Sequence, residues 1–446
     1  MNITVVGGGY VGLVSAVGFC EFGFEVCLVE QDSKRLENLK VGKSTVYEPG
    51  LDLMLRRHIE NKRMVFSGDL AGMAANSDAI MIAVSTTPSD DTDLDLTILH
   101  NTIKVISSAL VKGKYAGIFI RSSVPVGTCS IIAENVKFIR PDLIAGQDYD
   151  IIANPTFLRE GTAIKDFMSP DLELIGLNKD SLKARELVEM LYDTLLHLQI
   201  PFVYANFESI ELVRSVIIAL SATKMAFINE IKEICNRTDA DINVVIRSLV
   251  IEQKSGENAL LVSPGIGGSS FPRNMRILSQ FANSLGLDLK ILNGAIQSNT
   301  NRIRQISEKI INMITDDEPL NSKRVTIFGL TYKAQTNDIR ESASLIVIER
   351  LLSEGISVYL YDPAYKPNSE YLERIPKKVM ENKKFYLTNT AYEAVVQSNI
   401  LVIMTAWSEF YGLNYDKIRE LMCQSKGKQP IILDYKDIVA SSGKNV

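Results

Sequence analysis

The sequence predicts an α/β protein in which two Rossmann-like, doubly wound domains are joined by a central helical domain with a long spine helix. Three observations carry this prediction. Strand-like apolar runs alternate with helical patterns near the start, a long helical pattern fills the middle, and the alternation restarts near the end. The length of 446 residues exceeds what one hydrophobic core supports, so two or three domains are expected.

The first 150 residues show the alternation most clearly. Four short apolar runs have the composition of strands buried on both faces, and amphipathic stretches such as 34–40 and 95–110 lie among them. Strands that alternate with helices form βαβ units and a parallel sheet. The four predicted strands are ITVVG (3–7), EVCLVE (25–30), AIMIAVS (79–85) and AGIFIRSS (116–123).

The middle of the chain has a helical pattern from about 207 to 250. Residues 208–238 contain neither Pro nor Gly, and such a length is typical of a spine between domains or of a subunit interface. Residues 275–316 are again mostly helical, and the strand pattern restarts at KRVTIFGLTYK (323–333). Further predicted strands are SVYLYDP (357–363), ILVIMTA (400–406) and PIILDY (430–435), which gives predicted domains at 1–205, 206–316 and 317–446.

The composition excludes several classes of function. The net charge is −5 and no basic stripe occurs, so nucleic acid is not an expected partner. The most apolar helical stretch, 216–228, lies between Arg214 and Glu230 and is interrupted by Lys224, so no membrane span is expected. No secretory signal pattern precedes the first strand, which favours a cytoplasmic location. Five cysteines and three histidines lack paired or metal-ligand spacing, so neither a disulfide framework nor a metal site is expected.

A glycine-rich turn follows the first predicted strand. VVGGGYVGL (5–13) fits the GxGxxG pattern, in which the glycines allow a tight turn, a close approach of a pyrophosphate and close helix packing. Glu30 ends the second strand about 20 residues on, where a carboxylate accepts hydrogen bonds from ribose hydroxyls and repels a 2′-phosphate. We therefore predict NAD as cofactor. The position of Glu30 disfavours the alternative, a glycine turn in an unrelated α/β protein. The predicted contacts in this region are Gly7, Gly9, Tyr10, Val11, Gly12 and Glu30.

Five motifs in this order resemble the UDP-glucose and GDP-mannose dehydrogenase family, closest to its UDP-glucose 6-dehydrogenases, over essentially the whole chain. The resemblance implies an N-terminal NAD domain, a central dimerisation domain that makes a homodimer, and a C-terminal UDP-sugar domain. It also implies the oxidation of UDP-glucose by two NAD to UDP-glucuronate through a thioester, and it adds Arg35, Thr87 and Ser123 to the cofactor contacts. The motifs are YVGLVSAVGF (10–19), YEPGL (47–51), RSSVPVGT (121–128), NPTFLREGTA (154–163) and GLTYKAQTNDIRES (329–342).

The resemblance also identifies the positions of catalytic groups. The family reaction needs a base for the C6 hydroxyl, a cysteine thiolate that traps the aldehyde, a carboxylate that activates water, and donors that stabilise the oxyanion. Ser270 stands at the cysteine of the family's GGSCFPKD, and Asn274 stands at its aspartate. Arg214, Ile218 and Thr156 stand at the positions of a lysine, an asparagine and a glutamate.

Two further catalytic positions keep suitable groups, a carboxylate at Glu160 and a hydroxyl at Ser123. The five substitutions remove the chemistry that a thioester route requires. A hydroxyl is a far weaker nucleophile than a thiolate, and a guanidinium stays protonated at neutral pH. We therefore expect that the full four-electron oxidation is lost.

The resemblance places the UDP-sugar on residues from several motifs. Two family arginines fall on Lys254 and Lys436, which keep the charge and lose bidentate geometry, so binding of the UDP-sugar is expected to be weakened. An ordinary solvated surface stays an equal alternative for the basic residues. The predicted substrate contacts are Phe157, Leu158, Glu160, Lys254, Gly267, Lys333 and Arg340.

Three hypotheses stay open at this point. The first is a divergent oxidoreductase that performs one two-electron step with Glu160, Ser123 and Arg214 as its polar groups. The second is a non-catalytic nucleotide-binding homologue that regulates or partners an active paralogue. The third is a different β-hydroxyacid-type dehydrogenase, which the motifs YEPGL and NPTFLREG disfavour.

Overall fold

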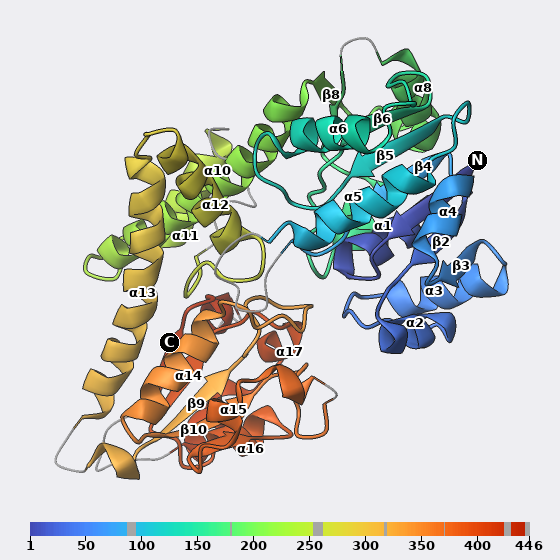
Figure 1. Ribbon diagram of the computed structural model, residues 1–446. Helices are drawn as coiled ribbons and strands as arrows, with labels where there is room; N and C mark the ends of the chain where they lie inside the picture. The colour runs from blue at the N-terminus through green and yellow to red at the C-terminus, as the bar shows by residue number, and fades with distance from the viewer. Residues whose placement is uncertain are drawn as a thin grey trace. The chain divides into compact units, whose positions relative to one another are not determined.

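The structure is a computed structural model that describes residues 1–86, 95–178, 181–252, 262–315, 319–369, 371–422 and 430–441. The chain divides into two compact units, an N-terminal unit of residues 1–216 and a C-terminal unit of residues 217–446 (Figure 1). The predicted boundaries at 205 and 316 stay a prediction. Among the described helices, none has both the length and the apolar character that a membrane span needs.

The N-terminal unit is built on a sheet whose strand order is β3-β2-β1-β4-β5-β6-β7-β8. Every neighbouring pair is parallel except β6 and β7, which are antiparallel. This order confirms the predicted doubly wound α/β sheet, because the chain runs outward in opposite directions from β1 and β4. The strands are β1 (Asn2–Val6), β2 (Glu25–Val29), β3 (Met64–Ser67), β4 (Ala79–Ile82), β5 (Ala116–Ile120), β6 (Tyr149–Ala153), β7 (Glu173–Gly176) and β8 (Phe202–Ala205).

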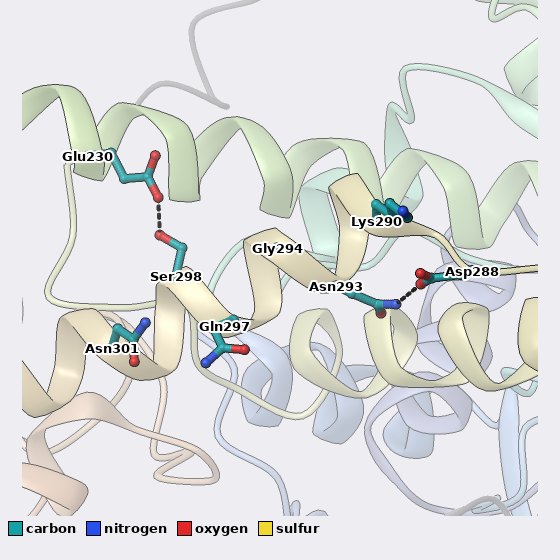
Figure 2. A pocket seen from close by; sticks show the side chains of 8 residues that line it. All are labelled: Glu230, Asp288, Lys290, Asn293, Gly294, Gln297, Ser298 and Asn301. Atoms are coloured by element: carbon teal, nitrogen blue, oxygen red, sulfur yellow. Dashed lines mark hydrogen bonds between the residues drawn. The ribbon is translucent and has the colours of Figure 1, made fainter.

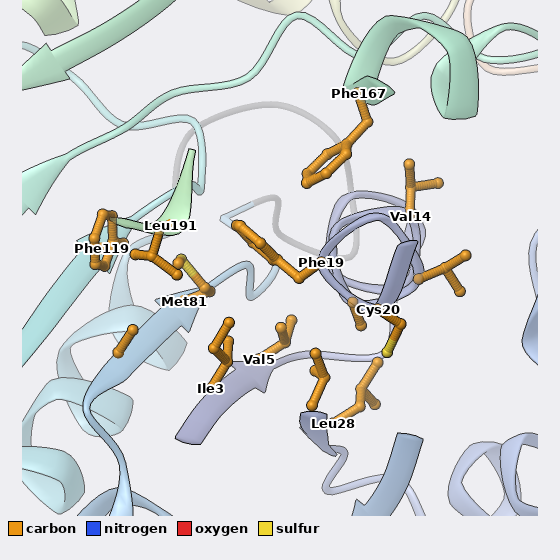
Figure 3. Close-up of a cluster of buried hydrophobic side chains, with 14 of the residues drawn as sticks. Ile3, Val5, Val14, Phe19, Cys20, Leu28, Met81, Phe119, Phe167 and Leu191 are labelled. Atoms are coloured by element: carbon orange, nitrogen blue, oxygen red, sulfur yellow. The ribbon is translucent and has the colours of Figure 1, made fainter. Parts of the chain in front are cut away.

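Helices cover both faces of this sheet, so all residues of the central strands β4, β5 and β6 are buried. On one face, the Phe19 and Phe167 rings lie 5.2 Å apart in an edge-to-face contact (Figure 3). The helices of this unit are α1 (Tyr10–Glu21), α2 (Ser33–Lys40), α3 (Leu51–Glu60), α4 (Leu70–Asn76), α5 (Thr97–Ala109), α6 (Thr128–Ile139), α7 (Ala163–Met168), α8 (Leu182–Leu191) and α9 (Asp193–His197).

The predicted long helix is α10 (Phe207–Cys235), which starts in the N-terminal unit and ends in the C-terminal unit. Its first turns are fixed by Glu211, which is 4% exposed and accepts hydrogen bonds from the backbone N–H groups of Gly127 and Cys129 at 2.6 and 2.8 Å. These N–H groups lie at the start of α6, where a carboxylate compensates for unpaired helix donors. The helical pattern continues in α11 (Ile242–Ile251).

The C-terminal unit combines helices with a second parallel sheet of order β11-β10-β9-β12-β13. Helix α13 supplies Ile303, Ile306 and Ile310 to the core of this sheet, so helices and sheet share one core. The strands are β9 (Arg324–Phe328), β10 (Ser357–Tyr361), β11 (Phe385–Leu387), β12 (Ile400–Ile403) and β13 (Ile431–Asp434).

The remaining helices of the C-terminal unit include the two that follow α11 and a series of shorter ones around the second sheet. Their bounds are α12 (Phe271–Ser284), α13 (Lys290–Ile314), η2 (Leu320–Ser322), α14 (Ala343–Ser353), η3 (Leu372–Arg374), α15 (Lys377–Met380), α16 (Ala391–Val395), α17 (Ser408–Tyr411), α18 (Tyr415–Leu421) and α19 (Ile438–Ser441).

Candidate cofactor and substrate sites

The glycine-rich turn lies between β1 and α1, at the carboxyl edge of the first sheet. Gly7 has φ +105°, and a Cβ on it would lie 2.7 Å from the Ala83 carbonyl oxygen. A Cβ on Gly12 would overlap the carbonyl oxygen of Gly7. Both positions therefore require glycine, one for its backbone conformation and one for the close contact of α1 with the turn.

Gly9 is the N-cap of α1, and Tyr10 and Val11 begin the helix. A Cβ on Gly9 would meet no protein atom within 4 Å, so the backbone is open to a close neighbour at this point. Unpaired N–H groups and the helix dipole make the first turn of α1 favourable for an anion. This geometry suits a pyrophosphate, as the sequence predicts.

Glu30 follows β2 and is 6% exposed. Its carboxylate accepts hydrogen bonds from the Gly8 N–H at 2.9 Å and from the Asp32 N–H at 2.8 Å. The Arg35 guanidinium pairs with it at 2.9 Å. The structure thus brings the predicted Glu30 and Arg35 together at the glycine turn, on the side where a ribose would lie.

The ends of β4 and β5 are tied together next to the glycine turn. The Thr86 hydroxyl donates to the Ser123 carbonyl at 2.8 Å, and the Ser122 hydroxyl donates to the Val84 carbonyl at 2.7 Å. Ser123 therefore lies at the carboxyl edge, near the switch point between β1 and β4. The predicted contact Thr87 lies outside the described residues.

The segment after β6 carries four of the predicted site residues, Thr156, Phe157, Leu158 and Glu160. Thr156 is 8% exposed, and its carbonyl accepts a hydrogen bond from Arg214 Nε at 3.3 Å. Two predicted catalytic positions from distant parts of the chain are thereby brought together. Phe157 and Leu158 are half-buried and pack against the two core clusters of the N-terminal unit, which fixes the segment to the sheet.

Sequence reasoning missed one residue at this site, Glu48 of the YEPGL motif. It is 8% exposed, and its carboxylate accepts hydrogen bonds from the Gly161 N–H at 2.6 Å and the Ala163 N–H at 2.8 Å. It also accepts the hydroxyl hydrogen bond of Tyr10. Burial and this bond raise the pKa of the Tyr10 hydroxyl far above its usual value. The motif signalled that Glu48 matters, but no spacing pattern links it to residues more than 100 positions away.

In the C-terminal unit, Ser270 is the N-cap residue of α12. Asn274 is 3% exposed, and its amide donates to the Ser270 carbonyl at 2.7 Å and contacts the Ser270 hydroxyl at 3.4 Å. Ile218, on α10, is buried and 6% exposed. The Asn274 side chain, which lies at hydrogen-bonding distance from the Ser270 hydroxyl, is a carboxamide and has no useful basicity.

The loop before Ser270 packs on the loop that follows β9. The Gly268 N–H donates to the Arg340 carbonyl at 2.9 Å, and a Cβ on Gly267 would lie 2.6 Å from the Glu341 carbonyl oxygen. The Arg340 guanidinium binds Asp338 in a bidentate pair at 2.9 and 2.7 Å. The structure thus brings the loop that contains Gly267 against the loop that contains Arg340. Lys333 lies in the same loop after β9, whereas Lys254 lies outside the described residues.

Lys436 follows β13 and adjoins a cavity of about 440 Å³ in the C-terminal unit. Arg302, Asp434 and Tyr435 are among the residues that line this cavity. Burial, with a smaller effect of the Arg302 charge, lowers the pKa of the Lys436 ammonium to about 8. Lys436 therefore loses its charge in the range around pH 8, unlike an arginine at the same place.

A second cavity of about 460 Å³ lies on α13 (Figure 2). Asn293, Gln297 and Asn301 line it at four-residue spacing, and Ser298 donates a hydrogen bond to Glu230 of α10 at 2.5 Å. None of the predicted site residues lines it. Among the described residues, no cluster of side chains could hold a metal ion, and the four described cysteines are free thiols.

The doubly wound sheet, the glycine turn and the carboxylate after β2 define a dinucleotide-binding α/β protein. Comparison with known families identifies residues 1–196 as the NAD binding domain of the UDP-glucose/GDP-mannose dehydrogenase family, residues 208–301 as its central domain and residues 326–441 as its UDP binding domain. The chain therefore belongs to the UDP-glucose/GDP-mannose dehydrogenase family, and the predicted NAD cofactor is confirmed by its NAD binding domain.

Relatives match this chain along nearly its whole length. The UDP-glucose 6-dehydrogenase of Rhizobium meliloti is 32% identical over 98% of this chain and 95% of its own. The enzyme of the same name from Rickettsia typhi is 33% identical over 98% and 96%. A solved UDP-glucose dehydrogenase from Pyrobaculum islandicum matches with a TM-score of 0.85 at 26% identity, over 98% of this chain and 94% of its own.

Proposed function

We propose that this protein binds NAD and a UDP-sugar and does not complete the four-electron oxidation of UDP-glucose to UDP-glucuronate. The protein catalyses at most one two-electron oxidation of the UDP-sugar. In that step the C6 alcohol loses a hydride to NAD and a proton to a base, which gives NADH and the aldehyde.

The observation that carries the proposal is the surroundings of Ser270. The second hydride transfer of a thioester route needs a thiolate, and the hydroxyl of Ser270 faces the carboxamide of Asn274 at 3.4 Å. A serine needs an adjacent base to attack an aldehyde, and a carboxamide does not accept the proton.

The surroundings of Thr156 and Arg214 support the same conclusion. Neither the threonine hydroxyl nor the guanidinium changes its protonation state near neutral pH, so neither residue serves as a general base. Arg214 is also engaged with the Thr156 carbonyl at 3.3 Å. Glu160 is the carboxylate of the motif NPTFLREGTA, and it can accept the proton of the C6 hydroxyl in the first step.

The proposal is tested by counting NADH formed for each UDP-glucose consumed by the pure protein. At most one NADH is expected, and two would overturn the proposal. None, with NAD binding intact in a parallel titration, would favour the second candidate, a nucleotide-binding homologue without catalysis. As a matched comparison, a variant that combines Ser270→Cys, Asn274→Asp, Arg214→Lys, Ile218→Asn and Thr156→Glu is expected to approach two NADH.

We further propose that the protein is a cytoplasmic homodimer that pairs through α10. Leu220, Phe227 and Ile234 are 54%, 57% and 58% exposed and follow one another at seven-residue spacing. Such a stripe covers one helix face and suits packing against a second helix. Phe227→Glu is expected to shift the sedimentation coefficient to that of a monomer, whereas Lys309→Glu on α13 serves as a charge control. A dimer that survives Phe227→Glu would contradict this interface.

A further inference from the structure

We propose that Glu48 is a positioning residue that couples NAD binding at α1 to the segment that carries Glu160. The carboxylate of Glu48 receives three hydrogen bonds, from the Tyr10 hydroxyl and from the Gly161 and Ala163 N–H groups. Tyr10 is the first residue of the cofactor helix, and the two amides belong to the first and third residues after Glu160. One buried side chain therefore connects the two parts of the site.

The three hydrogen bonds are arranged so that a movement of one partner of Glu48 affects the others. Glu48 Oε2 is shared by Tyr10 and the Gly161 N–H at 2.6 Å, while Oε1 binds the Ala163 N–H at 2.8 Å. Because Glu48 is 8% exposed, water has little access to its carboxylate, and the loss of one hydrogen-bond partner costs free energy. A shift of Tyr10 at the cofactor end of α1 is thereby transmitted to the Gly161 amide through one oxygen atom.

Local sequence explains why Glu48 is held in place. Pro49 and Gly50 follow it, Gly50 has φ +83°, and α3 begins at Leu51. The Leu51 N–H donates to the Glu48 carbonyl at 3.2 Å, so the backbone of Glu48 is fixed by this turn. The side chain is therefore presented by a rigid element, which is a requirement for a positioning residue.

A purely structural role would join α1 and α7 without any dependence on ligand. The two helices also pack closely at Gly18 and Phe167, so the Glu48 hydrogen bonds are one of at least two contacts between them. Its place at the N-terminal ends of both helices, beside the glycine turn, indicates a connection to bound ligand rather than to packing. NAD binding at α1 then favours an ordered Glu160 segment, and an ordered segment favours NAD binding to the same extent.

The test is hydrogen–deuterium exchange of the full chain, followed in a peptide that contains residues 159–165, with and without saturating NAD. Wild type is expected to exchange about fivefold more slowly in this peptide when NAD is bound. Tyr10→Phe keeps both amide bonds to Glu48, so exchange without NAD is expected to stay the same while the NAD-dependent protection falls. Glu37→Gln, an exposed side chain on α2, is the matched control and should behave as wild type.

Two results would overturn the inference. One is that NAD leaves exchange of this peptide unchanged in wild type, and the other is that Tyr10→Phe retains the full NAD-dependent protection. The consequence for substrate rests on the proposed function, because Glu160 acts there on a UDP-sugar. The exchange experiment uses NAD alone, so a failure to bind UDP-glucose would contradict the proposed function and leave the coupling measurable.

Discussion

The two sheets place a carboxylate at the same topological position and use it differently. Glu30 follows β2 in the first sheet, and Asp362 follows β10 in the second. Strands β2 and β10 each pair with the first strand of their sheet in chain order, β1 and β9. Glu30 faces the glycine turn that precedes α1. Asp362 is completely buried and accepts hydrogen bonds from the Leu330 N–H at 2.6 Å and the Trp407 indole at 3.2 Å.

The chain after the first strand of each sheet explains the difference. In the first sheet α1 begins at Tyr10, directly after the glycines, so the N–H groups of its first turn face the carboxyl edge. In the second sheet α14 begins at Ala343, after the loop 329–342. Asp362 binds backbone N–H groups of this loop and thereby fixes it. At the carboxyl edge of the first sheet, a helix N-terminus follows the first strand. At the same edge of the second sheet, a loop of residues 329–342 takes that place.

The largest expected effect comes from Gly12→Ala in the first sheet. The new Cβ would overlap the Gly7 carbonyl, and because this contact is with backbone it cannot be relieved by a rotamer change. We expect a loss of about 3 kcal/mol or more in stability and loss of NAD binding, measured by calorimetry and titration. Gly9→Ala is the control for stability alone, since its Cβ would meet no protein atom within 4 Å but would lie where the pyrophosphate is expected. A Gly12→Ala protein of normal stability would contradict the role assigned to α1 packing.

Asp362→Ala should lower the stability of the C-terminal unit, which contains the second sheet, and leave the N-terminal unit unchanged. The substitution leaves the Leu330 and Ala364 N–H groups without their acceptor, which costs about 2 kcal/mol. Trp407 is the single tryptophan of the chain and donates to Asp362, so its fluorescence reports directly on this unfolding. NAD affinity should stay unchanged. If Asp362→Ala lowered NAD affinity as much as Gly12→Ala does, Asp362 and Glu30 would not act independently.

Glu30→Ser should change the cofactor preference of the protein. The substitution removes the negative charge and frees Arg35 from its 2.9 Å ion pair. A guanidinium beside the ribose suits a 2′-phosphate, so we expect the affinity ratio of NADP to NAD to rise about tenfold in titrations of both cofactors. Glu30→Ser with Arg35→Ala is the matched control, and the same rise in that double variant would rule out Arg35 as the cause.

The smallest expected effect concerns pH and Lys436. Its lowered pKa of about 8 means that the ammonium is charged below pH 8 and neutral above it. If this charge binds the diphosphate of a UDP-sugar, affinity for UDP should fall about threefold between pH 7 and pH 9 in calorimetric titrations. Lys436→Arg keeps its charge over this range and should remove the dependence. An equal fall in both proteins would assign the titration to another group.

Much of the fold could be predicted because it depends on local pattern. The four predicted strands of the first sheet correspond to β1, β2, β4 and β5, and the stretches 34–40 and 95–110 correspond to α2 and α5. Strand β6 was missed because its sequence, YDIIA, contains a buried acidic residue, Asp150. Asp150 is accommodated there by hydrogen bonds from Ser181 at 2.7 Å and Tyr115 at 3.0 Å, which a local pattern does not show.

Local patterns were enough to predict the glycine turn, the carboxylate after β2, the α/β class and the long helix, because spacing and hydrophobic period act over a few residues. Three sets of contacts became visible in the folded chain alone: Glu48 with Gly161 and Ala163, Arg214 with Thr156, and Asp362 with the loop that follows β9. These contacts join a side chain to backbone groups far along the chain. A backbone N–H is the same in every residue, so the sequence carries no mark of which one a buried carboxylate will bind.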